Sequence, residues 1–321
     1  MESCIGVVNL LPPEWNAKWP KLDWVVTALQ RNGNEVRVCR NRDGTEKLFS
    51  ECDYVILGHK SISGRWVNLR DRIKDRKCPA VYWWFDLVAT HPNCHISAQP
   101  LFSTFKDTFR ESDIVLVKEH SLLNEYRESG VNAYWFDQGV LSDFPIAIHK
   151  KNPKWDILLW GHSCSVDSNS NAWRDRYKDA KFLAEKGFKV AWATPSSTVP
   201  NGIERLPWTH PNELHELAAD ARCVLSVGYR NDIRGYWSDS FWMAVGMGNV
   251  VIRRNTEGIP DGPYLRYTDR DELLEKADWS INNPIDAMRE GAREWATTSQ
   301  SLETKTQTLT QLVKTATEKA S

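Results

Sequence analysis

The sequence predicts an α/β protein with two doubly wound parallel sheets and a helical strap at the C-terminus. Short apolar strand segments alternate with helix segments along most of the chain, and two prolines and three lysines interrupt this alternation at 144–155. A length of 321 residues is enough for two domains, each with its own core. We therefore expect an N-terminal domain at 1–148, a second domain at 149–285 and a C-terminal helix at 286–321.

Strands and helices are expected to alternate regularly through the first domain. This alternation predicts parallel strands with helices on both faces of the sheet. The loop after the first strand lacks the glycine-rich fingerprint of dinucleotide-binding folds, so no dinucleotide site is expected there. The expected strands are 5–8, 35–39, 54–57, 80–85, 114–117 and 133–136, and the expected helices are 22–31, 66–74, 101–109 and 122–128.

A second alternation follows the interruption, and the chain then stays helical from 284 to 319. The carboxyl ends of the two expected sheets should face a shared cleft, which is where ligands bind in such folds. The expected strands are 156–160, 189–193, 223–227 and 250–252, and the expected helices are 173–185, 211–220, 240–245 and 270–280.

Composition narrows the class of protein. Lys and Arg total 41 against 42 Asp and Glu, and the net charge of -1 gives no overall attraction to nucleic acid or to an anionic membrane. No apolar run approaches the roughly 20 residues of a membrane helix, and the first residues lack the basic region of a signal peptide. The seven cysteines are scattered singly, which predicts free thiols in a reducing compartment and no metal site. We expect a soluble cytoplasmic protein.

The segment 235–267 is a helix followed by a buried strand, with polar residues at its loop ends. Good N-cap residues precede the apolar helix, and a helix N-terminus favours an anion. Basic residues flank the unit, so a phosphate ligand is the natural hypothesis. The alternative is an ordinary helix and strand with solvated arginines. The cap residues are Ser238, Asp239 and Ser240, and the basic residues are Arg234, Arg253 and Arg254.

A second group of candidates follows the expected strand 156–160. Gly161 begins a turn, and Arg174 and Arg176 open the next helix. Guanidinium groups there are suited to diphosphate oxygens, and the hydroxyl of Ser163 is a further donor. A solvated helix face and an ordinary serine-containing loop are the alternatives.

Three segments resemble the GT-B glycosyltransferases, specifically the group-1, spore-maturation-protein-like family. The first segment comprises 112–117, 123–131 and 135–140, and the second is 155–161. The third comprises 236–248, 257–259 and 267–274. Together they cover roughly the last two-thirds of the chain. The resemblance implies two Rossmann-like domains facing a cleft. It also implies transfer of a sugar from a nucleoside diphosphate sugar, such as a UDP sugar, to a hydroxyl acceptor, without a cofactor or metal.

The family's usual Arg-x-x-Glu before the glycine turn, whose Glu holds the ribose hydroxyls, is replaced here by 240–243, which ends in Met243. Asp239 and Glu257 are the candidate substitutes for the missing carboxylate. A differently held donor and a catalytically degenerate sugar-nucleotide-binding module are the alternatives.

Three residues are candidates for the general base that deprotonates the acceptor. Asp86 ends an aromatic-rich strand at the carboxyl edge of the first sheet, where aromatic walls would raise its pKa. His91 is the competing base, and Asp137 follows another strand of that sheet. Structural capping is the alternative role for Asp86.

The acceptor is left open between a glycan, a protein, a small metabolite and a hydroxymethylated base in phage DNA. Neutral net charge disfavours duplex DNA, although a local basic cluster would supply phosphate contacts. A nucleotide-sugar epimerase is a rival, but it would need a carboxylate-rich pocket. The sequence defines no oligomeric state. The cluster comprises Arg65, Arg70, Arg72, Arg76, Lys118, Lys150, Lys151 and Lys154.

Overall fold

The computed structural model describes residues 3–9, 21–41, 44–58, 76–83, 109–120, 123–163, 174–228 and 231–320. The chain divides into two compact units. The first unit takes 1–91, 96–141 and 302–321, and the second takes 92–95 and 142–301.

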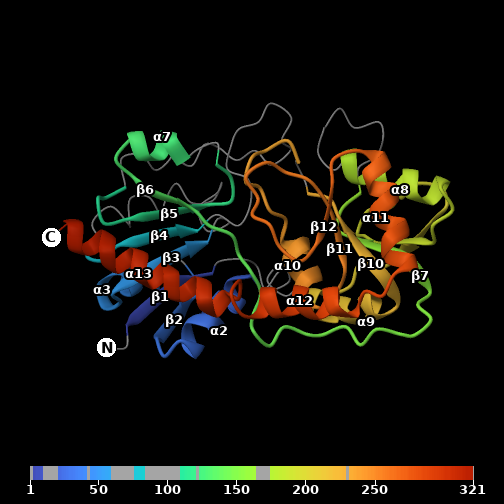
Figure 1. Cartoon of the computed structure of the whole chain (residues 1–321). Helices are drawn as coiled ribbons and strands as arrows, with labels where there is room; N and C mark the ends of the chain where they lie inside the picture. Colours follow the sequence, from blue (N-terminus) through green and yellow to red (C-terminus); the bar gives the residue numbers. More distant parts are fainter. Residues whose placement is uncertain are drawn as a thin grey trace. The chain divides into compact units, whose positions relative to one another are not determined.

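The first unit contains a parallel sheet with the strand order β2-β1-β3-β4-β5-β6 (Figure 1). Its described strands are β1 (Cys4–Val8), β2 (Glu35–Cys39), β3 (Tyr54–Gly58), β4 (Ala80–Trp83), β5 (Ile114–Val117) and β6 (Asn132–Trp135). Its described helices are α2 (Lys21–Arg31), α3 (Thr45–Glu51), α7 (Leu123–Glu128) and α13 (Leu302–Ala320).

Both faces of this sheet are covered, as the apolar runs of the central strands require. One face packs against α3 and α7 through residues such as Leu48 and Tyr126. The last helix, α13, returns to this unit and packs against α2 (Figure 1). The Asn32 amide donates to the Thr306 hydroxyl at 2.9 Å, and the hydroxyls of Tyr54 and Thr310 lie 3.1 Å apart.

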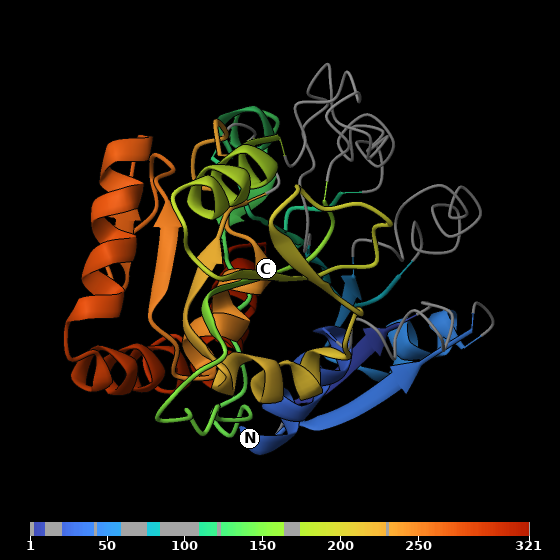
Figure 2. The same cartoon turned by 90° about the vertical axis from the view of Figure 1, so that its right-hand side faces the viewer.

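The second unit contains a second parallel sheet, with the order β12-β11-β10-β7-β8-β9. In Figure 2 the orange helix α11 stands beside this sheet. The described strands are β7 (Trp155–Trp160), β8 (Val190–Ala193), β9 (Ile203–Leu206), β10 (Ala221–Ser226), β11 (Val251–Arg254) and β12 (Leu265–Tyr267). The helices are α8 (Arg174–Glu185), the 3₁₀ turn η2 (Pro211–Glu213), α9 (Leu214–Ala219), α10 (Asp239–Gly246), α11 (Arg270–Asn282) and α12 (Asp286–Thr297).

Helix α10 begins where its N-cap residue predicts, because Ser238 accepts a hydrogen bond from the Ser240 backbone N–H at 3.3 Å. Its apolar body packs against α12. The Trp237 and Trp242 rings stack 4.6 Å apart, and Trp295 of α12 stacks on Trp242 at 5.1 Å. These aromatic contacts fix the helix against its unit.

The predicted α/β class with two parallel sheets is confirmed. Three short elements, α3, β9 and β12, were not predicted, since each is too short or too polar to show a clear period. The tail expected at 286–321 is two helices, α12 and α13, which lie in different units. The helix predicted at 66–74 and nearly all of the one at 101–109 lie outside the described residues.

Candidate functional site

Three polar side chains form a row across neighbouring strands of the second sheet. Ser226 of β10 is in register with Arg253 of β11. The register of Val224 with Leu158 places Ser226 beside Trp160 of β7, two residues further along both strands. Residues in register on parallel strands project from the same face. Trp160, Ser226 and Arg253 therefore lie side by side at the carboxyl ends of their strands.

Each member of this row is buried and carries a polar atom without a hydrogen-bond partner. These atoms are Nε1 of Trp160, Oγ of Ser226, and Nε and Nη1 of Arg253. Buried polar groups are nearly always paired, and leaving one unpaired costs about 1–3 kcal/mol. Three such residues on adjacent strands indicate a site whose partner comes from a ligand.

Arg253 is the most unusual of the three, because it is a cation only 1 % exposed. Among the described residues it makes one hydrogen bond, from Nη2 to the Tyr236 carbonyl at 3.1 Å, and no ion pair. Its guanidinium carbon lies 5.1 Å from the Phe241 ring centroid and 5.5 Å from that of Trp237. Burial lowers the pKa of Arg253 to about 10, so it remains charged at neutral pH. An anionic ligand would compensate this charge.

Arg176 of α8 is a second buried arginine, but its donors are used. Its Nε and Nη2 donate to the Val227 carbonyl at 3.0 and 2.6 Å, and Nη1 donates to the His162 carbonyl at 3.0 Å. Burial lowers its pKa to about 10. Arg176 therefore links the segments that follow β7 and β10, and it adds positive charge there.

Gly161 makes this link possible. Its φ of 105° lies in the left-handed region that favours glycine, and a Cβ would stand 2.7 Å from Nη1 of Arg176. The predicted glycine turn thus leaves the space in which the buried Arg176 guanidinium packs.

A narrow crevice, too tight in this structure to hold a water molecule, lies between two members of the row and a helix start. Its lining includes Trp160, Arg176, Ser226 and Ser240 of the first turn of α10. Pockets that enclose a whole ligand usually measure about 300–1,000 Å³, so this crevice marks where side chains converge and is not itself a ligand pocket. The buried cation Arg176, the unpaired polar atoms of Trp160 and Ser226, and the helix N-terminus favour an anionic group beside this crevice.

Other predicted donor residues take different places. Arg174 is exposed at the start of α8. The Ser163 hydroxyl donates to the Thr198 carbonyl, which gives it a role within its own loop. Asp239 lies half-buried in the first turn of α10, next to Ser240. The Glu257 side chain is 78 % exposed and forms an ion pair with Arg234 at 3.3 Å.

The carboxyl edge of the first sheet holds a separate group of buried polar residues. Asp86 and His91 lie outside the described residues. Asp137, 6 % exposed, forms an ion pair with Lys305 of α13. Gln138, 1 % exposed, has no partner for either amide atom. Sequence reasoning missed Gln138, Trp160 and Ser226, because only their burial without partners distinguishes them.

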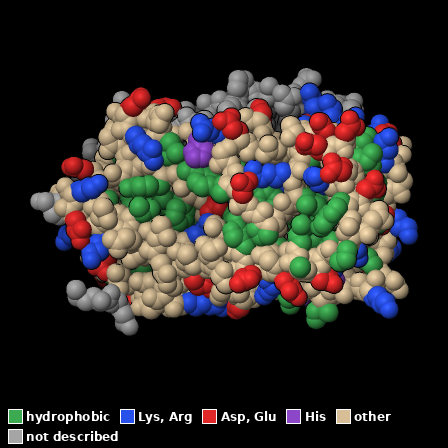
Figure 3. Space-filling view, viewed as in Figure 1, with side chains coloured by type: hydrophobic (Ala, Val, Ile, Leu, Met, Phe, Trp, Pro, Cys, Tyr) green, Lys and Arg blue, Asp and Glu red, His purple; other side chains and the backbone are tan. Residues whose placement is uncertain are grey.

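Among the described members of the proposed basic cluster, Arg76 and Lys118 are buried, while Lys150, Lys151 and Lys154 are exposed. Arg76 is buried in an ion pair with Asp113, and Lys118 is 1 % exposed. Lys150 pairs with Asp220 at 2.5 Å, and Lys154 pairs with Glu204 at 2.7 Å. Arg65, Arg70 and Arg72 lie outside the described residues. On the face in Figure 3, acidic and basic side chains are interspersed.

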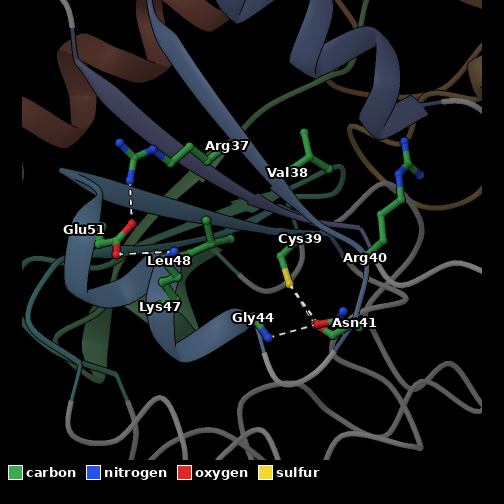
Figure 4. Close-up of a pocket in the computed structure, with 9 residues that line it drawn as sticks. All are labelled: Arg37, Val38, Cys39, Arg40, Asn41, Gly44, Lys47, Leu48 and Glu51. Carbon is green, nitrogen blue, oxygen red and sulfur yellow. Dashed lines mark hydrogen bonds and ion pairs between the residues drawn. The ribbon is translucent and has the colours of Figure 1, made fainter.

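A second pocket lies in the first unit, between β2 and α3 (Figure 4). It measures about 430 Å³, and charged side chains line it. Arg37 reaches Glu51 at 2.6 Å, and Lys47 lies 3.8 Å from the same carboxylate. Arg37 and Lys47 therefore both have Glu51 as a partner. Neither cation indicates a binding site for an anion.

The described residues contain no cluster of three or more His, Cys, Asp or Glu side chains arranged to hold a metal ion. Within the same ranges, no helix has the length and apolar character needed to cross a membrane.

No family model matches the chain, and no curated protein matches it in sequence. Solved structures do match. An alpha-glucosyltransferase in complex with UDP and a 13-mer DNA containing an HMU base has a TM-score of 0.66 and 13 % identity, over 98 % of this chain and 100 % of that one. The beta-glucosyltransferase of phage T4 has a TM-score of 0.58 and 13 % identity, over 99 % of each chain.

A sucrose-phosphate synthase from Thermosynechococcus elongatus also matches, with a TM-score of 0.63 and 11 % identity over 98 % of this chain and 100 % of that one. At these identities the likeness concerns the fold. The protein has the two-sheet GT-B fold of glycosyltransferases, as the sequence resemblance predicted.

Proposed function

We propose that the protein is a glycosyltransferase that moves a sugar from a nucleoside diphosphate sugar, with UDP as the nucleotide, to a hydroxyl acceptor. The row of unpaired donors at Trp160, Ser226 and Arg253 is the observation that carries the proposal. The matching structures support it, since their names include UDP and UDP-glucose complexes.

In this reaction the acceptor oxygen forms a bond to the anomeric carbon, while the bond from that carbon to the diphosphate breaks. Negative charge develops on the departing diphosphate. We propose that Arg253 supplies unpaired N–H donors to this charge, while Arg176 and the N-terminus of α10 add positive charge, the role that a divalent cation plays in metal-dependent transferases. The acceptor hydroxyl proton passes to a general base.

We propose Asp86 as that base, with His91 as its competitor. Nζ of Lys305 donates to Oδ1 of Asp137, so the Asp137 carboxylate already has a partner within the protein. That pairing favours the other two candidates. For the ribose, we propose Asp239 over Glu257, because Asp239 is half-buried next to Ser240, which lines the crevice, while Glu257 is exposed and paired with Arg234.

We propose a hydroxymethylated base in DNA as the acceptor. Its support is the likeness to an alpha-glucosyltransferase bound to DNA and to the phage T4 enzyme. A base inside a duplex must leave the stack to reach an active site, at a cost of a few kcal/mol. A glycan or a small metabolite is the alternative acceptor.

One transfer assay tests both donor and acceptor. Purified protein receives labelled UDP-glucose with hydroxymethylated DNA, unmodified DNA or simple sugars. We expect label only in the hydroxymethylated DNA. Label incorporated into the simple sugars would instead indicate that the acceptor is a glycan or a small metabolite. Epimerised nucleotide sugar would indicate the epimerase, and UDP binding without turnover would leave a sugar-nucleotide-binding module.

Ser226→Ala should separate ligand contacts from stability. Because the Ser226 hydroxyl has no partner in the protein, its loss should change the melting temperature little. If the hydroxyl donates to the diphosphate, the affinity for UDP should fall about tenfold. Calorimetry with UDP measures this, and Ser163→Ala is the matched control with unchanged affinity. Equal affinity in wild type and Ser226→Ala would remove Ser226 from the site.

A further inference from the structure

Two thiols of the first unit lie in contact although they are 48 residues apart in sequence. The Cys4 thiol donates a hydrogen bond to Sγ of Cys52, with the sulfur atoms 3.5 Å apart. Cys4 is half-buried at the start of β1, and Cys52 is 7 % exposed just after α3. A disulfide bond is about 2.05 Å long, so bond formation requires an approach of about 1.5 Å.

Backbone hydrogen bonds hold both cysteines in this position. The Cys4 N–H donates to Oδ2 of Asp53 at 2.8 Å, and the Cys4 carbonyl accepts from the Asp53 N–H at 2.7 Å. The Cys52 N–H donates to the Leu48 carbonyl at 3.0 Å and caps α3. The pair is therefore held in place by the fold, and side-chain rotation is the smallest movement that could close it.

The two thiols differ in accessibility and in chemistry. Burial, and then the hydrogen bond from Cys4, raises the pKa of Cys52 to about 12, which the nearby Arg37 charge partly opposes. Cys52 is thus protected from reagents in solution, while the half-buried Cys4 can be reached. This asymmetry suits an attacking thiol and a resolving thiol.

We propose that Cys4 and Cys52 form an oxidation site that closes as a reversible disulfide when the protein meets a small-molecule disulfide. The Cys4 thiolate attacks one sulfur of oxidised glutathione, which forms a mixed disulfide and expels one glutathione thiolate. The Cys52 sulfur, as its proton leaves, then attacks Sγ of Cys4 and expels the second glutathione thiolate. Two cysteine thiols are oxidised, one glutathione disulfide is reduced, and two protons are released.

The cross-link would join the first strand of the sheet to the end of α3. It would enclose the chain between Cys4 and Cys52 and restrict the unfolded state. Because Glu51 of the pocket in Figure 4 directly precedes Cys52, the bond would also anchor that side of the pocket. This inference is independent of sugar transfer.

The full chain is treated with oxidised glutathione, its free thiols are alkylated, and it is examined by intact mass and peptide mapping. We expect the loss of two hydrogens, one peptide pair joining Cys4 to Cys52, and a melting temperature of the first unit raised by roughly 5 °C. Dithiothreitol should reverse all three changes. Cys4→Ser and Cys52→Ser should each abolish the linked peptides.

Cys39→Ser is the matched control, since Cys39 is buried in the same unit and its thiol donates to the Asn41 carbonyl at 2.7 Å. This variant should still form the bond. The proposal is overturned if Cys4 and Cys52 are still free for alkylation after the oxidation step. It is also overturned if glutathione stays bound to Cys4, or if the peptide map shows a disulfide between other cysteines.

Discussion

Replacing Arg253 with methionine will lower the affinity for UDP about a hundredfold and leave the melting temperature unchanged or raised. The loss follows because two guanidinium nitrogens without protein partners, Nε and Nη1, would donate to the ligand, and hydrogen bonds to charged groups contribute about 1.5–3 kcal/mol. The stability result has the opposite sign, because a buried cation without an anion is costly and an apolar residue of similar size is often neutral or stabilising.

Arg254→Met is the matched control for this experiment, as it changes the next residue on the same strand. Arg254 donates to Oδ2 of Asp179 at 2.8 Å, and Asp179 is 1 % exposed. Its loss should lower stability and spare UDP affinity. Calorimetry and thermal unfolding measure both quantities. Arg253→Met with wild-type affinity would show that the unpaired guanidinium has no ligand role.

Arg176→Met will destabilise the second unit by about 2–4 kcal/mol, the reverse of the result for Arg253. Three hydrogen bonds from Arg176 serve two backbone carbonyls, those of Val227 and His162, and removing a partner from a buried acceptor costs about 1–3 kcal/mol. The measurement is urea unfolding without ligand. Arg174→Met, an exposed neighbour on α8, should change stability by less than about 0.5 kcal/mol.

Equal stability of Arg176→Met and wild type would show that the two carbonyls find other partners. Arg176→Met also tests ligand binding, because its guanidinium lines the same crevice as Ser240. An affinity loss in folded Arg176→Met would indicate that its charge reaches the phosphates.

Most of the fold was predictable because the central strands are continuous apolar runs. Residues 54–57 and 114–117, for example, are buried on both faces, and such runs require a parallel sheet covered by helices. The three residues of β12 and the Ile203–Leu206 strand, with its two exposed central residues, carry too little periodic signal. Their pairing depends on neighbouring strands.

The site was predictable only as a region. N-cap chemistry limited the start of α10 to Ser238, Asp239 or Ser240, and in the structure Ser238 is the cap. Sequence could not tell Arg253 from Arg254, because the alternation of a strand decides which side chain enters the core and which meets Asp179. Arg174 and Arg176 present the same problem on a helix. The tertiary environment of each arginine determines its role.

The return of α13 to the first unit has a consequence for synthesis on the ribosome. Residues 142–301 can fold as soon as they leave the exit tunnel, because that stretch carries the second sheet and all the helices that cover it. The first unit is completed only by 302–321, which follow the whole of the second unit along the chain. Its α2 and Tyr54 lack their contacts with α13 until that helix is synthesised, so the first unit completes its packing after the second unit.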